Sequence, residues 1–389
     1  MLSDAGSQAT TIAYPLLALA ITGSAAQAGL VSFARLVPSA LFSIPAGLAA
    51  DRHDRRRMMI AADVIRGLAM AALALAIVSD EVAFWQLPVV AFIEGTGTAV
   101  FYAAQAGALR SVVPVPQLPA AFGIREARSA TVRLLGPFVG GALFGVARAL
   151  PFAVDAVSYA CSTVSLSAMR TPFQEAGERS ADGVRTRLAE GFWFLWERPF
   201  LRTCAFLYGL GNFALPGIFL VIVVVGEAQG LSSARIGVLF TVFGLCTLVG
   251  SVTSPVFRRR LSMRSILWIE LWAWMGSAAF LVWPNVYVLV AGILPQAVAM
   301  PVTDSVVVGY RVAVTPDRLV GRVESMRSTI SLAIAPLGPL VAGLLLEAVS
   351  ARATVGVFTA VSAVLLGWGM LSPAIRRAPS LSELGAVVG

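Results

Sequence analysis

The 389-residue chain contains no lysine, one histidine and three cysteines, and only 13% of its residues are charged. Without lysine it has no GxxxxGK[ST] phosphate-binding loop, which argues against ATP as an energy source. The one histidine, His53, lies in a basic connection, so histidine-rich metal sites and histidine-based triads are excluded. Cys161, Cys204 and Cys246 lie in apolar runs without CxxC spacing, and we interpret them as small buried side chains.

Hydrophobic residues make up 58% of the chain, and the mean hydropathy is +0.82. A chain this apolar does not close as a soluble domain, so the composition predicts a polytopic membrane protein. Crossing about 30 Å of hydrocarbon takes roughly 20 apolar residues. We expect an all-α protein whose twelve membrane helices lie at residues 2–22, 27–50, 58–79, 84–109, 120–146, 150–169, 200–225, 234–256, 263–283, 286–310, 321–347 and 353–373.

The arginines gather in alternate connections between these runs. Groups lie at 52–57, 258–264 and 376–377, whereas one intervening connection carries Asp80 and Glu81. Positive residues collect on the cytoplasmic side of membrane proteins, so this bias places both termini in the cytoplasm. Arginine in place of lysine is typical of GC-rich bacterial genomes, and we expect a multi-pass protein of the bacterial cytoplasmic membrane.

A polar segment divides the apolar runs six and six. We expect an N-terminal six-helix bundle at 1–170, a cytoplasmic central loop with an interfacial helix at 171–199, and a C-terminal bundle with a short cytoplasmic tail at 200–389. The halves repeat each other, which fits two bundles related by an axis along the membrane normal, with a substrate path between them. The matching residues are Gly47 with 55–57 and Gly250 with 258–260, and, at one spacing of 202, Pro114, Arg125, Gly136-Pro137 and Gly141 with Pro316, Arg327, Gly338-Pro339 and Gly343.

The connection after the second run joins a glycine, an acid and a block of arginines. It reads Gly47-Leu-Ala-Ala-Asp51-Arg52-His53-Asp54-Arg55-Arg56-Arg57. This stretch resembles the signature loop of the major facilitator superfamily, roughly Gly-x-x-x-Asp-Arg-x-Gly-Arg-Arg, and departs from it at Asp54, where the pattern has a glycine for a tight turn. The resemblance implies two six-helix bundles and a conformational gate formed by Gly47, Asp51, Arg52, Arg55 and Arg56. A basic loop that simply joins two membrane helices is the alternative.

The fifth apolar run carries a second motif of small residues. Pro137 is expected to remove a backbone hydrogen bond and bend this helix. The motif resembles the antiporter signature of the same superfamily, which recurs in its drug exporters, with Val132 departing at the second glycine. Close packing against a neighbouring helix is the alternative. The motif residues are Gly123, Gly136, Pro137, Gly140 and Gly141.

Charged side chains inside membrane helices are costly and are functional candidates by default. Glu94 and Arg133 lie at similar depth on adjacent antiparallel runs, so we expect a pair near the bilayer centre, either structural or able to take up and release a proton. Asp304 and Asp4 are the next candidates for proton coupling. The other charges inside the runs include Arg35, Asp155 and Glu270.

In the superfamily that these motifs resemble, the first, fourth, seventh and tenth helices line a central cavity. Polar and aromatic side chains on these helices are therefore candidates for substrate contact, although packing is the alternative for each aromatic residue. They are Asp4, Glu94, Asn212, Asp304, Gln105, Gln296, Phe101, Tyr102 and Phe213.

The resemblance implies a transporter, not an enzyme. It leans toward the twelve-span exporters of macrolides and siderophores, from the stretch 315–322, Thr-Pro-Asp-Arg-Leu-Val-Gly-Arg. We expect a proton-coupled exporter of small amphipathic molecules, such as a drug, an antibiotic or a siderophore. An importer of a small metabolite is the first alternative, and a membrane enzyme or a non-transporting sensor is the second. We expect a monomer with substrate, protons and lipid as partners, and no nucleic acid, metal or other cofactor.

Overall fold

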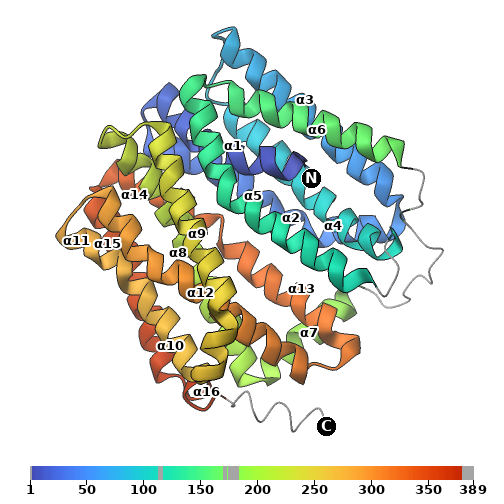
Figure 1. Cartoon of the computed structure of the whole chain (residues 1–389), viewed down its shortest axis with the longest axis vertical. Helices are drawn as coiled ribbons and strands as arrows, with labels where there is room; N and C mark the ends of the chain where they lie inside the picture. Colours follow the sequence, from blue (N-terminus) through green and yellow to red (C-terminus); the bar gives the residue numbers. More distant parts are fainter. Residues whose placement is uncertain (1, 113–116, 170–172, 174–183, 379–389) are drawn as a thin grey trace. The chain divides into compact units, whose positions relative to one another are not determined.

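The computed structural model describes residues 2–112, 117–169, 173 and 184–378, which form helices and no strand (Figure 1). Pro114 of the predicted repeat and residues 171–172 and 174–183 of the predicted central loop lie outside these residues. Ten helices are long and apolar enough to cross a membrane. Helices α1 and α6, with 21 and 19 residues, also have the length to span but carry more polar residues. Together they account for the twelve predicted spans.

The first six helices follow the predicted runs within a few residues. Ser24 caps α2 by accepting a hydrogen bond from the Gln27 amide, and Asp54 caps α3 by accepting one from the Arg57 amide at 2.9 Å. Asp54 has a φ of −62°, so this connection does not need the glycine of the superfamily pattern. The helices are α1 Leu2–Thr22, α2 Ala25–Arg52, α3 Arg55–Val78, α4 Gln86–Val112, α5 Leu118–Val146 and α6 Leu150–Ala168.

The second half contains the same number of spans, but two of them are interrupted. The predicted run 321–347 is split at Pro336, because proline has no amide hydrogen to continue the helix. The run 263–283 tightens to a 3₁₀ turn around Gly276, where a Cβ would overlap the backbone oxygen of Gly292. The elements are α7 Val184–Glu197, α8 Pro199–Ala228, α9 Ser233–Arg260, α10 Met263–Ala273, η2 Trp274–Ala278, α11 Ala279–Val282, α12 Val286–Val314, α13 Asp317–Ile334, α14 Leu337–Ala348, α15 Ala351–Leu371 and α16 Pro373–Arg376.

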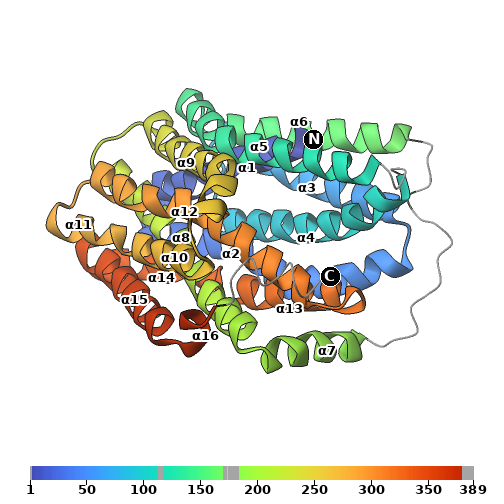
Figure 2. The same ribbon diagram turned by 60° about the horizontal axis from the view of Figure 1, so that its bottom comes forward.

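The chain forms two compact units, and each is described by itself. The first contains 1–180 with 226–241, and the second contains 181–225 with 242–389. In the first unit, α2 packs on α4, and α3 packs on both α4 and α6; Figure 1 shows α3 and α6 side by side. In the second, α12 packs on α10 and η2, and Figure 2 shows α7 alongside α13.

Helix α7 packs on α13 through a close backbone contact. A Cβ on Gly191 would overlap the carbonyl oxygen of Arg322, and the Arg322 guanidinium forms an ion pair with Glu190. Phe194 and Leu195 are both buried, so this face of α7 packs against the protein. Trp196 remains 41% exposed.

The repeat is present in the packing of the helices. A Cβ on Gly136 of α5 would overlap Gln8 of α1, and a Cβ on Gly338 of α14, 202 residues later, would overlap the backbone oxygen of Phe213 on α8. The arginine match is different. Residues 55–57 begin α3, whereas residues 258–260 end α9, so these two clusters do not occupy equivalent positions.

Candidate functional site

The arginines of the signature loop are held by backbone oxygens. Arg55 Nε donates to Ala50 O at 3.2 Å, and Arg56 Nε donates to Leu166 O at 2.7 Å. Gly107 leaves room for the Arg55 guanidinium, because a Cβ there would lie 2.5 Å from its Cζ. These contacts fasten the start of α3 to α4 and α6.

The acid of this loop is loosely held. Asp51 Oδ1 lies 3.9 Å from Arg55 Nη2, and its side chain is 61% exposed. Arg52 is exposed, and nothing lies within 4 Å of where a Cβ on Gly47 would be. Asp51 and Arg52 are thus available to other groups, whereas Arg55 and Arg56 have structural partners.

The antiporter-like motif brings α5 into backbone contact with its neighbours. A Cβ on Gly140 would overlap the carbonyl oxygen of Ala9, and one on Gly141 would overlap that of Ser233 in α9. Only glycine permits such an approach. Pro137 lies inside α5, and Gly123 lies near its start. Gly136, Gly140 and Gly141 therefore have a packing role.

The main polar feature of the first unit is a buried ion pair between α2 and α4. Arg35 Nε lies 2.7 Å from Glu94 Oε2, and Glu94 is 1% exposed. Arg35 also donates to Ser7 O at 2.8 Å and to Thr11 Oγ1 at 2.9 Å, which joins α1 to the pair. The sequence prediction named Arg133 as the partner of Glu94, whereas the ion pair in the structure is with Arg35. Which side of a helix a charge occupies decides this pairing, and depth alone does not.

A second ion pair lies beside the first. Arg66 binds Asp63 one turn away on α3, and both are buried. Thr98 connects the pairs, because it accepts from Arg66 Nη1 at 3.2 Å and donates to Glu94 Oε1 at 3.2 Å. Gly97 leaves space for the Arg66 stem. The sequence alone does not show the link of Asp63 and Arg66 to Glu94, because it does not reveal which faces of α3 and α4 meet.

Helix α6 completes this network with Tyr159 and Asp155. The Tyr159 hydroxyl lies 2.8 Å from Ser7 Oγ and 3.5 Å from Glu94 Oε1, and the Arg66 guanidinium lies over its ring. Asp155 is fully buried, and its carboxyl oxygens lie within hydrogen-bond distance of the Thr10 and Ser158 hydroxyls. Hydroxyl side chains at three- and four-residue spacing on α1 were the sequence signal for this network.

Asp4 belongs to a separate cluster near the start of α1. Arg128 Nη2 lies 2.6 Å from its Oδ2, and the Tyr102 hydroxyl donates to its Oδ1 at 3.1 Å. Tyr102 is 49% exposed, whereas Phe101 is 5% exposed and packs in a core with Met59 and Leu166. Phe101 is therefore a packing residue, and Tyr102 is the aromatic side chain that α4 leaves accessible.

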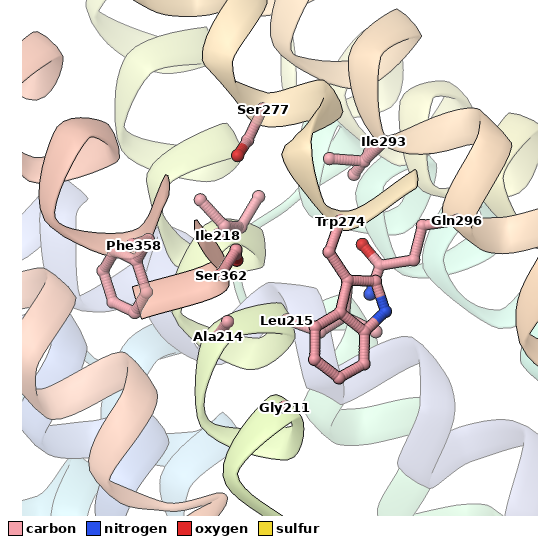
Figure 3. Close-up of a pocket in the computed structure, with 10 residues that line it drawn as sticks. All are labelled: Gly211, Ala214, Leu215, Ile218, Trp274, Ser277, Ile293, Gln296, Phe358 and Ser362. Carbon is pink, nitrogen blue, oxygen red and sulfur yellow. The ribbon is translucent and has the colours of Figure 1, made fainter. Parts of the chain in front are cut away.

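The second unit contains a small cavity of about 10 Å³, lined mostly by aromatic, aliphatic and small polar side chains. Such a volume holds roughly one water molecule. Figure 3 shows the Trp274 ring next to the Gln296 side chain, with Phe358 on the far side. Phe213 stacks on Phe358 at 5.2 Å, which places it behind this wall. Of the residues predicted to contact substrate, Gln296 lines this small void, and the predicted central cavity stays a prediction.

The acids of the second unit fall into two environments. Glu270 is 2% exposed and lies near Tyr208, Trp274 and Thr303. Asp304 is exposed and lies within the electrostatic reach of a chain of charges in which Arg311 binds Glu324, and Glu324 binds Arg327 at 2.6 Å. These acids therefore do not form an isolated pair of carboxylates.

The remaining candidates have ordinary surroundings. Asn212 is exposed and donates to Ser331, and Gln105 is half-buried. In the described part of the chain, no three His, Cys, Asp or Glu side chains are placed to hold a metal ion.

Twelve helices of membrane length, with ion pairs buried between helices of the first unit, define a polytopic α-helical membrane protein. The model of the Major Facilitator Superfamily matches residues 1–271 and 203–385, and the chain belongs to this superfamily. It is a multi-pass membrane transporter and not an enzyme.

Curated relatives match nearly the whole chain. It is 27% identical to the multidrug efflux pump Tap of Mycolicibacterium fortuitum, over 96% of this chain and 93% of that protein. It is 26% identical to Tap of Mycobacterium tuberculosis, over 99% and 92%. A shorter match, 28% identical over 43% of this chain and 44% of the relative, is with macrolide efflux protein A of Streptococcus pyogenes.

Solved structures share the fold. The nucleoside transporter NupG superposes with a TM-score of 0.72 at 13% identity, covering 97% of this chain and 98% of that one. A bacterial homologue of the iron transporter ferroportin gives 0.72 at 17% identity, covering 94% of each. At these identities the likeness concerns the fold alone.

Proposed function

We propose that this protein exports small amphipathic organic molecules in exchange for protons, by alternating access. The observation that carries the proposal is its full-length similarity to multidrug efflux pumps. One feature of the structure supports it: the ion pairs buried with Glu94 supply groups that can exchange a proton.

The energy available from protons is sufficient for such export. Each proton that moves down 100 mV supplies about 2.3 kcal/mol. Because 1.4 kcal/mol corresponds to a tenfold ratio, one proton sustains a gradient of roughly 50-fold. No nucleotide site is required.

The test is transport in proteoliposomes with an imposed pH gradient. Purified protein should accumulate macrolides and other amphipathic drugs against their gradient when the pH difference is imposed, and a protonophore should abolish this. Accumulation that does not depend on the pH gradient would exclude proton exchange. Transport in the opposite direction would indicate an importer.

The signature loop supplies a matched pair of variants. Asp51→Asn should reduce transport severely while leaving membrane insertion intact, because the exposed Asp51 carboxylate is available to a gate. Asp54→Asn keeps the helix cap through its side-chain oxygen and should transport normally. Wild-type turnover in Asp51→Asn would remove that residue from the mechanism.

The proposal also places the protein in the bacterial cytoplasmic membrane with both termini cytoplasmic. Single cysteines at Asp80 and Arg258, in a background without Cys161, Cys204 and Cys246, should be labelled from outside and from inside respectively. The reverse pattern would overturn the orientation.

A further inference from the structure

The buried network of the first unit has one carboxyl group more than it has guanidinium groups. Arg35 is paired with Glu94, and Arg66 is paired with Asp63. The unmatched acid is Asp155, which is 0% exposed and forms no ion pair in the described part of the chain. If all five groups were ionised, the network would hold an uncompensated negative charge away from water, which is costly.

The two hydroxyl groups that contact the Asp155 carboxyl group each lie closer to a backbone oxygen. Thr10 Oγ1 lies 3.3 Å from Asp155 Oδ2 but 3.0 Å from Ser7 O. Ser158 Oγ lies 3.0 Å from Asp155 Oδ1 but 2.7 Å from the backbone oxygen of Asp155. Each hydroxyl has a single hydrogen, and a backbone carbonyl can only accept. Ser7 O already accepts from Arg35 and Thr11, so the Thr10 hydrogen remains available to Asp155 Oδ2. The shorter contact of Ser158 takes its hydrogen, so that the Ser158 hydroxyl turns a lone pair toward Asp155 Oδ1.

A carboxylate cannot form a hydrogen bond with a lone pair of a hydroxyl group, because it has no hydrogen to donate. A carboxylic acid can, since its O–H on Oδ1 donates to Ser158 while Oδ2 accepts from Thr10. The charge count and this arrangement together favour one proton on Asp155.

The groups that face Asp155 come from every helix around it. The charges that act on it are Glu94 of α4, Arg35 of α2 and Arg66 of α3. Helix α1 adds the Tyr14 hydroxyl, and α6 adds that of Tyr159. The further charged groups are Asp63 on α3, Asp4 on α1, bound to Arg128 of α5, and Arg133 of α5.

We propose that Asp155 is the proton-binding group of this conformation and that it gives up this proton during the transport cycle; the second half of the statement rests on the proposed proton exchange. Release breaks the O–H bond of Asp155, leaves the electron pair on its carboxylate and passes the proton to water. Arg35 or Arg66 then supplies the compensating charge.

Helix α1 is the element that connects this step to movement. Gly6 lets α1 approach so closely that a Cβ there would overlap Asp155 Oδ1. The same helix provides Thr10 to Asp155, and Ser7 O and Thr11 to Arg35. A shift of α1 therefore changes the contacts of the proton site and of the nearest arginine together.

The direct test is infrared spectroscopy of the purified full-length protein. A protonated carboxylic acid has a C=O band separate from that of carboxylates, and it shifts in heavy water. We expect Asp155→Asn to lose one such band and Glu81→Gln, an exposed acid outside the network, to keep every band. Thr10→Val keeps the acid but removes a hydrogen-bond partner, so it should retain the band at a shifted frequency. A spectrum of Asp155→Asn that still contains every wild-type band would overturn the assignment.

Transport separates this inference from the proposed function. Asp155→Asn should keep passive exchange of substrate and lose accumulation driven by a pH gradient, whereas Glu81→Gln, an exposed acid outside the network, should keep both. If the wild type itself shows no gradient-driven transport, proton exchange fails while the infrared assignment stands. If Asp155→Asn accumulates substrate like the wild type, its proton is not the coupling proton.

Discussion

The two units have corresponding helices, but four charged positions in the network of the first unit are aromatic, amide or aliphatic in the second. Helices α2 and α9 run from 25 to 52 and from 233 to 260, an offset of 208, and the caps Asp54 and Ser262 give the same offset for α3 and α10. From α4 to α12 and from α6 to α15 the offset is about 202. At these offsets Arg35, Arg66, Glu94 and Asp155 correspond to Phe243, Trp274, Gln296 and Val357.

The difference shows that equivalent positions of a duplicated fold can carry different chemistry in each half. Where the first unit pairs Arg66 and Glu94 with opposite charges, the second places Trp274 and Gln296 in the wall of a cavity. Aromatic and amide groups contact amphipathic molecules without the cost of burying a charge. This fits the proposed function, with protons handled in the first unit and substrate contacted in the second.

The largest expected effect concerns coupling. Glu94→Gln fixes a neutral side chain in the network, so uphill export driven by a pH gradient should fall by roughly 50-fold for one proton at 100 mV. Substrate binding should survive. The corresponding change in the other unit, Gln296→Ala, should weaken binding and leave coupling intact. Coupling is measured as the transport rate at a series of imposed pH gradients. An equal loss of coupling in both variants would contradict the assignment of protons to the first unit and of substrate to the second.

The next effect concerns stability. Arg35→Gln leaves Glu94 buried without its partner, which should cost about 3 kcal/mol of unfolding free energy in detergent. Removing both charges should recover most of this loss, because no unpaired charge remains. A double-mutant cycle gives the coupling energy. Additive costs for Arg35→Gln and Glu94→Gln would show that the pair contributes little.

Glycine packing should be similar in both units and smaller in effect. Gly140→Ala forces a Cβ into the Ala9 carbonyl and should cost about 1–3 kcal/mol, as should Gly338→Ala at the Phe213 carbonyl. Gly145→Ala lies on the same helix as Gly140 with nothing within 4 Å, and should not destabilise the protein. Thermal unfolding of the three variants checks this, and a loss in Gly145→Ala equal to that in Gly140→Ala would refute the contact.

The smallest effects concern single hydrogen bonds. In the second unit, Ser277 and Thr359 share a buried bond of 3.0 Å, and Thr359→Val should cost about 0.6 kcal/mol. Tyr159→Phe should cost more, because that hydroxyl contacts both Ser7 and Glu94. Unfolding midpoints of both variants, compared with the wild type, would show in which unit the loss of one hydroxyl group costs more stability. A smaller cost for Tyr159→Phe would mean that the network does not depend on its hydroxyl.

The number and position of the spans could be predicted because hydrophobic length is a property of the sequence alone. The partner of Glu94 could not, because a helix that is apolar nearly all round does not reveal which face meets its neighbour. Arg35 rather than Arg133 binds it, since α2 and α4 pack along their lengths. Pro336 indicates a break between α13 and α14. The apolar residues on both sides of it nevertheless form one continuous run in the sequence, which predicts a single span.

The repeat shows a similar limit. The spacing of 202 correctly related Gly136 to Gly338, because those residues hold the same contact in each half. The basic clusters matched at a nearby spacing but belong to different helix ends. Sequence spacing finds repeated packing where insertions are absent, and it misleads where a connection has changed length.

The interruption at Pro336 also has a mechanical consequence. In the first unit α5 runs unbroken for 29 residues, whereas its counterpart is divided into α13 and α14. When a single molecule is pulled out of a bilayer from its C-terminus, α14 should leave after α15, and α13 should resist separately, so that α13 and α14 give two force peaks. Helix α5 should leave in a single step. The corresponding spans of the two halves would therefore unfold under force in different numbers of steps.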